Sequence, residues 1–354
     1  MNETAAIPGA PIWRPEELEY LGQCPVCSST ERELRHADLE DRFFSTGTRN
    51  WRSWSCLRCT SLYLDPRPRV DVIGRAYSSY YTHEAPRVTY AADNGTSIPW
   101  LLANGYMAAR FGHQRVPAWR VGRWLIPLLP PIRFQLDYFA RHLPKPAPGM
   151  ACLDVGCGNG GFLLRAQSAG WHASGVDVDE AAVNHGRAAD LEIECTALDD
   201  YAAAHRGAYH AVTVSHVIEH VHEPVLFVSI LRKMLRPDGL LWIATPNVQS
   251  LGHRLFGAGW RGLEAPRHLV IFNHHGLSEL IRRNGFCDVR LRRRGRHSSS
   301  ILAASLRSAV KTTANGERLS GLWQCVAWAN DLLASVVPGA GEELVLTARR
   351  TPDV

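Results

Sequence analysis

The stretch that decides the fold begins at residue 152 and reads Cys152-Leu153-Asp154-Val155-Gly156-Cys157-Gly158-Asn159-Gly160-Gly161. An apolar strand containing one acid runs into closely spaced glycines and then into Phe162-Leu163-Leu164, where we expect a helix. Because glycine has no Cβ, the backbone can turn tightly and a ligand can approach it, while the N–H groups at the helix start offer donors. The stretch therefore predicts a strand, turn and helix that cradle a nucleotide-type ligand.

The chain that follows alternates strands and helices. Strands are predicted at 151–155, 173–177, 191–195, 210–215 and 239–244, with helices near 161–169, 180–189 and 223–235. Such a βαβ rhythm predicts an α/β fold with a parallel sheet and helices on both faces. Towards the C-terminus we expect a helix at 276–284, a strand at 286–294, an apolar helical insertion at about 300–336 and a last strand at 343–348.

Two CxxC pairs precede this region. They comprise Cys24, Cys27, Cys56 and Cys59. With two residues between the cysteines of a pair, one tight turn, or knuckle, presents both sulfurs to a single metal ion. Two knuckles complete a closed tetrahedral site, for which zinc is the natural occupant. Four sulfurs leave no open position for catalysis, so we interpret the zinc as structural, within a ribbon-like module. The alternative is four unligated core thiols.

These patterns divide the chain into four parts. We predict a loose tail at 1–20, a zinc-binding module at 21–68, a helical linker or lid at 69–145 and a main domain at 146–354. The helical part can cover an active site, pack on the main domain, or form the contact of a homodimer.

Composition excludes few classes of protein. Of the 354 residues, 45% are hydrophobic and 21% charged, with a formal charge of +5, which permits an acidic substrate or RNA without requiring either. Paired cysteines suit metal in a reducing compartment, and neither a signal pattern nor an apolar run near the length of a membrane span occurs, so we expect a cytoplasmic protein without a membrane span.

The ligand of the glycine turn has two candidates. Gly156, Gly158 and Gly161 also satisfy the dinucleotide pattern G-x-G-x-x-G, which is weak when alone. Against NAD stand Asp154, which can meet a cationic amino group, the additional Gly160, and the long region that precedes the motif.

Four segments together carry a family resemblance. The glycine stretch resembles the first motif of class I S-adenosylmethionine-dependent methyltransferases, Gly175-Val176-Asp177 the acidic end of their second strand, and Ser215-His216-Val217-Ile218-Glu219-His220 the segment after strand four in the small-molecule branch. Leu235-Arg236-Pro237-Asp238-Gly239 is similar to the turn before strand five, although Leu240 follows where many members have glycine. The paired cysteines and the late strand look like a subgroup that modifies sugars and natural products.

The resemblance implies a Rossmann-like sheet of seven strands, the last inserted antiparallel, and S-adenosylmethionine as cofactor. It implies that the glycine turn contacts the methionine moiety, that Asp154 holds its ammonium, and that Asp177 accepts both ribose hydroxyls. The structural alternatives are that the glycines only form a tight connection between strand and helix, and that Asp177 only caps the helix that follows it. The implied cofactor-binding residues are Asp154, Gly156, Cys157, Gly158, Gly160, Asp177, Val178, Leu198, Asp199 and Ser215.

Methyl transfer to a hydroxyl needs an acceptor held in line and a base for its proton, and histidine suits the second task. His216 follows the fourth strand and is the first candidate base, His268 is the second, and His220 can assist. Helix capping or the satisfaction of buried backbone groups is the alternative for each. Candidate acceptor contacts are Glu219, Asn247 and His274, and a metal role for Glu219 with His220 stays open.

The leading hypothesis is a methyltransferase acting on a hydroxyl of a sugar or natural-product intermediate, with C-methylation as a variant. A zinc-ribbon RNA base methyltransferase and a non-catalytic scaffold are the alternatives, and we expect no nucleic-acid partner because no basic cluster with stacking aromatics dominates the ribbon. We interpret the arginines of 290–296 as a solvated strand edge, with phosphate binding as the alternative.

Overall fold

The computed structural model describes residues 13–41, 51–77, 97–310 and 321–352. Among these residues, no helix combines the length and the apolar character that crossing a membrane requires.

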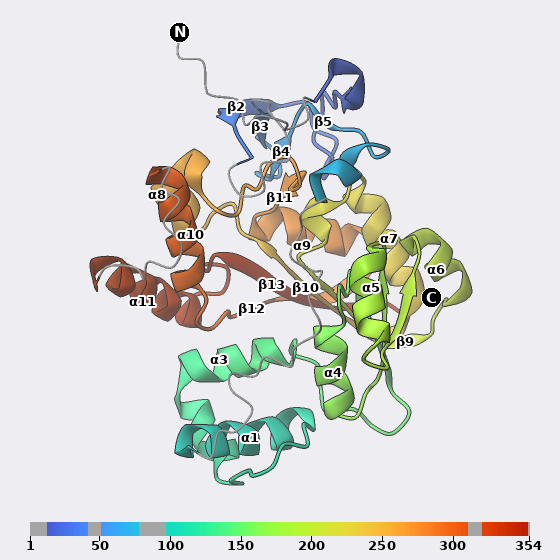
Figure 1. The fold of residues 1–354 in the computed structure, drawn as a ribbon, viewed down its shortest axis with the longest axis vertical. Coiled ribbons are helices and arrows are strands. Elements are labelled where there is room, and N and C mark those ends of the chain that lie inside the picture. Colours follow the sequence, from blue (N-terminus) through green and yellow to red (C-terminus); the bar gives the residue numbers. More distant parts are fainter. Residues whose placement is uncertain (1–12, 42–50, 78–96, 311–320, 353–354) are drawn as a thin grey trace.

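A seven-stranded sheet forms the centre of the molecule (Figure 1), in the order β12-β13-β10-β9-β6-β7-β8. Neighbours from β8 to β10 run parallel, whereas β13 is antiparallel to both β10 and β12. The predicted seven-stranded sheet with an inserted antiparallel strand is confirmed. The strands are β6 Ala151–Val155, β7 His172–Asp177, β8 Glu192–Cys195, β9 Tyr209–Ser215, β10 Leu235–Pro246, β12 Phe286–Arg292 and β13 Glu343–Arg350.

Helices cover both faces of this sheet because side chains alternate along each strand. On β6, Cys152 packs in an apolar cluster with α4 and α5, whereas Leu153 and Val155 pack in another with α6, α7 and α9. The parallel arrangement places the carboxyl ends of β6, β7, β9 and β10 along one edge. The helices are α4 Gly161–Ser168, α5 Glu180–Arg187, α6 Leu198–Ala204, the short η4 Ile218–His220, α7 Pro224–Met234 and α9 His274–Arg283.

The N-terminal region forms a second sheet that is not self-contained. Its order is β11-β4-β3-β2, and β11 comes from the main part of the chain, pairing Val270 with Tyr63 and Ile271 with Leu62. Figure 1 shows this sheet above the carboxyl edge of the central one. In the same region β1 and β5 pair as a separate two-stranded sheet. The elements of the region are η1 Pro15–Glu17, β1 Leu18–Glu19, β2 Arg32–Leu39, β3 Trp51–Cys56, β4 Leu62–Leu64, β5 Arg67–Pro68 and η2 Ile73–Tyr77, and β11 is Val270–Ile271.

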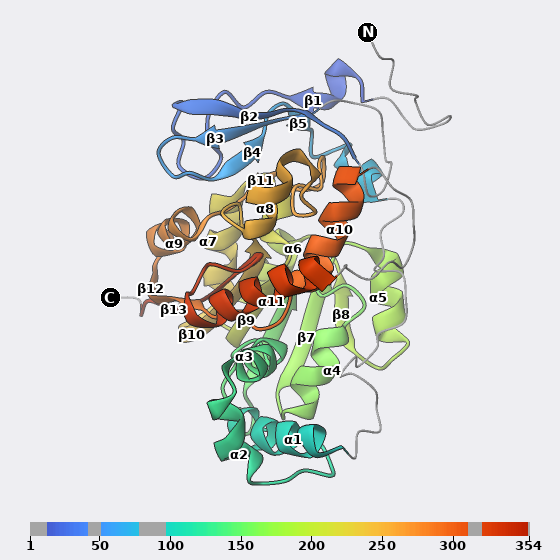
Figure 2. The same cartoon turned by 90° about the vertical axis from the view of Figure 1, so that its left-hand side faces the viewer.

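The remaining helices lie in two groups. One group precedes the central sheet and packs beneath it, and the other flanks β13 (Figures 1 and 2). The first comprises α1 Ile98–Phe111, α2 Gly122–Leu125, η3 Ile126–Leu128 and α3 Pro130–Phe139. The second comprises α8 Leu251–Phe256, η5 Gly257–Gly259, α10 Ser298–Val310 and α11 Gly321–Val336.

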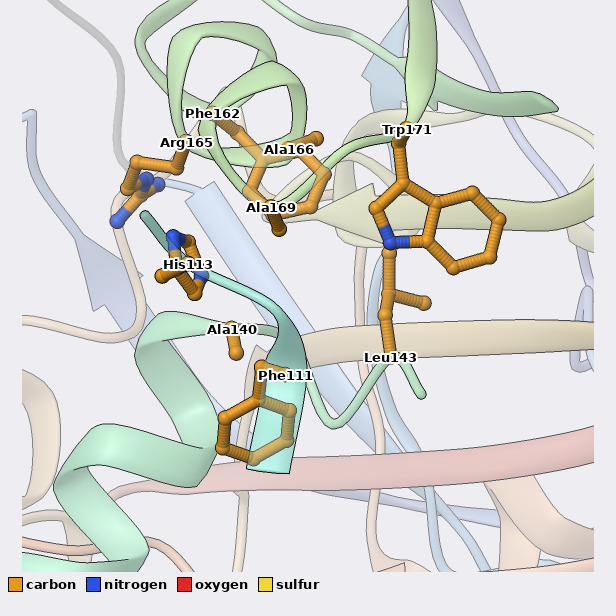
Figure 3. Close-up of a pocket in the computed structure, with 9 residues that line it drawn as sticks. All are labelled: Phe111, His113, Ala140, Leu143, Phe162, Arg165, Ala166, Ala169 and Trp171. Atoms are coloured by element: carbon orange, nitrogen blue, oxygen red, sulfur yellow. The ribbon is translucent and has the colours of Figure 1, made fainter. Parts of the chain in front are cut away.

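The helices that precede the central sheet pack against α4 through an apolar contact. Figure 3 shows Phe111 and Ala140 on one side and Phe162, Ala166 and Ala169 on the other, around a hollow of about 10 Å³. A space of that size holds no more than about one water molecule. This hollow is therefore a packing detail and not a ligand site.

Candidate active site

The glycine turn after β6 has the conformation that its sequence predicts. Gly156 and Gly160 have φ angles of 67° and 81°, a region that side chains other than glycine rarely adopt. A Cβ on Gly156 would lie 2.3 Å from Cγ2 of Val217, the residue after His216. The turn therefore packs directly on the segment that follows β9.

Asp177, at the end of β7, is held by the same turn. Its Oδ2 accepts from the Gly158 N–H at 2.7 Å and its Oδ1 from the Asp179 N–H at 3.0 Å. Burial raises the pKa of this carboxyl above its ordinary value, although these N–H donors oppose the shift. A carboxylate has about four acceptor positions, so the backbone donors leave capacity for a ribose hydroxyl.

Asp154 does not have the partner that we expected. Its side chain is 1% exposed, and its Oδ1 accepts from the Arg141 guanidinium and from Thr213 Oγ1, the latter at 2.9 Å. The guanidinium also stacks 3.7 Å from the ring centre of Phe162. Asp154 lies on the face of β6 that is covered by the connection between α3 and β6, where the guanidinium of Arg141 is its ionic partner. Its role in holding the cofactor ammonium stays a prediction.

A cavity of about 220 Å³ lies where β9 and β10 end and β13 begins. We call it the histidine cavity, because four imidazoles contribute to its wall. Three of these are predicted candidates, His216, His220 and His268, and the fourth is His297. The other lining residues are Pro246, Trp260, Arg261, Gly262, Glu264, Ile301, Glu342 and Glu343.

His216 is clamped between two carboxylates. Its Nδ1 lies 3.2 Å from Glu219 Oε1 and its Nε2 lies 2.7 Å from Glu343 Oε1. Burial opposes the charged imidazole, yet Glu343 and Glu219 together raise the pKa of His216 well above its ordinary value. Arg294 Nε, which donates to Glu343 at 2.7 Å, completes a charged chain. A protonated ring has no lone pair to accept a proton, so this geometry disfavours our first candidate as the base.

His268 has the opposite character. Its Nδ1 lies 2.7 Å from the carbonyl oxygen of Gly262 and donates to it, which leaves Nε2 as a lone pair. That Nε2 lies 3.6 Å from Glu264 Oε2, beyond a hydrogen bond. Burial and the neighbouring His220 hold the pKa of His268 well below its ordinary value. The second candidate is therefore neutral, oriented and able to accept a proton.

His220 shares this arrangement. Its Nδ1 lies 3.1 Å from the carbonyl oxygen of Arg267 and 3.0 Å from the hydroxyl of Tyr77. A donor at Nδ1 again leaves Nε2 unprotonated, and the ring meets His268 edge to face at 4.7 Å. Ligand atoms of Glu219, His220 and His268 all lie within 4.8 Å of one another, so the three could also share a divalent cation.

Two predicted acceptor contacts lie elsewhere. Asn247 is fully buried, and its amide donates to the carbonyl oxygens of Gly339 and Gly341 at 2.8 and 2.9 Å, so it fastens a loop. His274 begins α9, contacts Gln249 and lines a different surface hollow. The structure brings neither of these side chains to the histidine cavity. Glu219 is fully buried beneath it, between His216 and the hydroxyl of Thr245.

The remaining cofactor candidates border the carboxyl edge of the sheet. Ser215 ends β9, the exposed Val178 follows β7, and Leu198 and Asp199 begin α6 after β8. Cys157 is buried and its sulfur packs under Gly175, where a Cβ would lie 2.6 Å from it, so only its backbone faces the turn.

The four cysteines form a compact cluster at the top of the molecule. Sγ atoms of Cys24 and Cys59 lie 3.6 Å apart and those of Cys27 and Cys56 lie 3.5 Å apart. Each pair closes a turn, and all four sulfurs lie within 4.8 Å. Thiolates at about 2.3 Å around a tetrahedral zinc are separated by about 3.7 Å, so the donor set fits that ion.

The N-terminal region also contacts the residue that precedes His268. Arg267 is fully buried and donates to Asp41 at 2.9 Å, to Glu264 at 3.1 Å and to the carbonyl oxygen of Ala76 at 3.0 Å. Because Arg267 directly precedes His268, the contact connects the N-terminal region to the candidate base. Sequence reasoning missed Glu343, which lines the cavity, and the contacts of Arg294 with Glu343 and of Arg267 with Glu264, since only the fold brings these partners together.

Comparisons with known proteins agree with this architecture. Residues 132–291 match the family described as "Methyltransferase domain". The chain is similar to the ubiquinone biosynthesis O-methyltransferases of Thiobacillus denitrificans, with 33% identity over 121 residues, and of Neisseria meningitidis serogroup A, with 33% over 122 residues. Each alignment covers 32% of this chain and 52% or 50% of the relative, so the chain spans about half the length of the curated relatives it matches.

A solved structure described as a SAM-dependent methyltransferase from Archaeoglobus fulgidus is similar with a TM-score of 0.42 and 19% identity, over 63% of this chain and 94% of the other. The domain match, the strand order and the glycine turn together define the class. Residues 132–291 carry a methyltransferase domain, which includes the parallel part of the sheet.

Proposed function

We propose that the protein transfers the methyl group of S-adenosylmethionine to a hydroxyl of a small molecule held in the histidine cavity, with His268 as the general base. The observation that best supports the proposal is the contact of Gly156 with Val217, because the glycine turn is the proposed cofactor cradle and the neighbours His216 and His220 line the cavity. The resemblance to O-methyltransferases supports oxygen as the acceptor atom.

When bound, the cofactor supplies a methyl group activated by its sulfonium. The chain then has to orient the acceptor and remove its proton. With cofactor and acceptor bound, Nε2 of His268 would take the proton of the acceptor hydroxyl, while its Nδ1–H stays hydrogen-bonded to the carbonyl oxygen of Gly262. The protonated His216 with Glu343 and Arg294 provides a fixed charged wall that can orient polar groups of the acceptor.

We assign the acceptor to sugars or other polyhydroxylated natural-product intermediates. The imidazole, carboxylate and guanidinium groups among the residues that line the cavity support an acceptor with several hydroxyls. We assign the four cysteines to a structural zinc ion, because their spacing and closed geometry suit it.

The test compares His268→Gln with His274→Gln, a matched histidine outside the cavity. The zinc-loaded protein receives methyl-labelled cofactor and a panel of monosaccharides and catechols, and mass spectrometry follows labelled products. We expect His268→Gln to lower kcat by roughly 100-fold or more while the cofactor Kd is retained, and His274→Gln to change neither. Unchanged turnover in His268→Gln would contradict the assignment of the base.

The same assay gives a different result if Glu219, His220 and His268 share a divalent cation. Turnover would then depend on added Mg²⁺, and His220→Gln would lose as much activity as His268→Gln. Independence from Mg²⁺ with a milder effect of His220→Gln supports the role of His268 as base.

A further inference from the structure

Helix α11 has its polar and apolar sides reversed relative to a helix on a water-facing surface. Its polar side is buried, where Asn330 donates to Ser298 Oγ at 2.9 Å and Asp331 accepts from the Ser298 N–H at 2.9 Å. Its outer side is apolar, with Leu322 and Trp328 exposed to 75% and 71% of their surface. The other exposed apolar side chains of this helix are Leu332, Leu333 and Val336.

A second apolar surface adjoins the first. Residues 119–132, from the approach to α2 to the first turn of α3, expose two tryptophans and several leucines, with Leu128 at 73%. Helices α11 and α3 contact each other, and Figure 2 shows α2, α3 and α11 on the side that faces the viewer. We call the exposed apolar residues of α11 and of 119–132 the apolar face. Its members in the second segment are Trp119, Val121, Trp124, Leu125, Leu128, Leu129 and Ile132.

The charges around this face have a single sign. Residues 97–136 contain five arginines and no acidic residue, and Asp137 is buried with the hydroxyl of Tyr106 at 2.6 Å. In α11 the only charged residue is Asp331, which is buried. The guanidinium of Arg123 stacks 3.9 Å from the ring centre of Trp124, and Arg120 is exposed beside them.

We propose that the apolar face docks on the surface of an anionic lipid bilayer. Trp and Leu side chains on a helix that lies in the interface enter the boundary between headgroups and acyl chains, and arginines beside them meet lipid phosphates. A second copy of the chain is the less suitable occupant, because a two-fold contact through this face would place the same arginines against each other.

Docking would bring lipid close to the histidine cavity. Asn330, on the buried side of α11, lies 3.3 Å from Glu342, and Glu342 lines that cavity together with His297 at the start of α10. The wall of the cavity is thus one helix away from the bilayer, which suits an acceptor that is delivered from a membrane surface.

The test is flotation of the zinc-loaded full chain with vesicles of phosphatidylcholine alone or mixed with phosphatidylglycerol. The variants are Trp328→Ser/Leu332→Ser and Arg120→Gln/Arg123→Gln, and Leu226→Ser, a half-exposed leucine on α7, is the control. We expect the wild type and the control to bind mixed vesicles, the serine variant to bind roughly tenfold more weakly or worse, and the glutamine variant to lose its preference for anionic lipid.

Three results would overturn the proposal: no vesicle binding by the wild type, equal binding by the serine variant, or a concentration-dependent dimer that the serine variant abolishes. The last would assign the face to a second copy. Cofactor affinity is measured in parallel, so retained cofactor binding without vesicle binding would reject this inference and leave the proposed function standing.

Discussion

Replacing Arg267 by methionine tests whether the N-terminal region and the methyltransferase domain form one cooperative structure. Methionine keeps much of the apolar volume but removes a guanidinium that is fully buried and that donates to Asp41, Glu264 and the carbonyl oxygen of Ala76. Arg261 still contacts Glu264, so the main loss is the buried ion pair between Arg267 and Asp41. Breaking one side of a buried ion pair costs about 3–5 kcal/mol.

Since domains are stable by about 5–15 kcal/mol, this loss is a large share of the total. Urea unfolding followed by circular dichroism should show the midpoint falling by roughly 1–2 M. The control is Arg283→Met, which removes an ion pair with Glu279 at 2.7 Å whose side chains are 51% and 39% exposed, and which should cost about 1 kcal/mol or less. A value for Arg267→Met as small as that of the control would refute the reasoning.

Three further predictions concern the cofactor, the cysteines and pH. Asp177→Asn should weaken cofactor affinity by roughly tenfold or more, because a charged acceptor of ribose hydroxyls is lost, and calorimetry with an unchanged Kd would reject that role. Cys56→Ser should abolish the bound zinc detected by metal analysis and lower the unfolding midpoint; a variant that keeps full zinc occupancy would contradict a four-cysteine site. Burial and the neighbouring His253 lower the pKa of His36 from 6.5 to about 4. The contribution of the neutral His36 ring to stability is therefore fully present above pH 6.5 and is lost as pH falls towards 4, because the unfolded chain takes up the proton first. We expect the acid-side slope of unfolding free energy to flatten in His36→Gln, and an unaltered slope would exclude this linkage.

The strands and the glycine turn could be predicted because their signals are local. The apolar run into Gly156 predicts β6 and its turn, and the observed strand coincides with the predicted 151–155. Alternation of strands and helices likewise predicts the parallel part of the sheet. The pattern of the six residues 343–348 predicts the last strand. The observed strand β13, Glu343–Arg350, confirms this prediction and continues for two more residues.

The chemistry of the site could not be predicted because it depends on partners distant in sequence. Whether His216 is a base or a cation is decided by Glu343, which is 127 residues away, and the sequence pattern places Arg294 on an exposed strand edge, whereas its side chain is buried against that same carboxylate. The same applies to Asp154, whose partner Arg141 comes from the connection after α3. Residue type and local spacing identify candidates, whereas protonation follows from the fold.

The shared sheet was also beyond a sequence prediction. Strand β11 has only two residues, Val270–Ile271, and no pattern distinguishes so short a strand from a loop. Its pairing with β4 connects the cysteine module to the segment that carries His268, which gives the four-cysteine cluster a structural connection to the site.

The central claim is that the glycine turn and Asp177 hold S-adenosylmethionine beside the histidine cavity. Isothermal titration calorimetry of the zinc-loaded protein with S-adenosylmethionine tests it most directly. We predict saturable binding of one cofactor per chain, which S-adenosylhomocysteine competes away and Asp177→Asn weakens. A folded, zinc-loaded protein that shows no binding would contradict the claim.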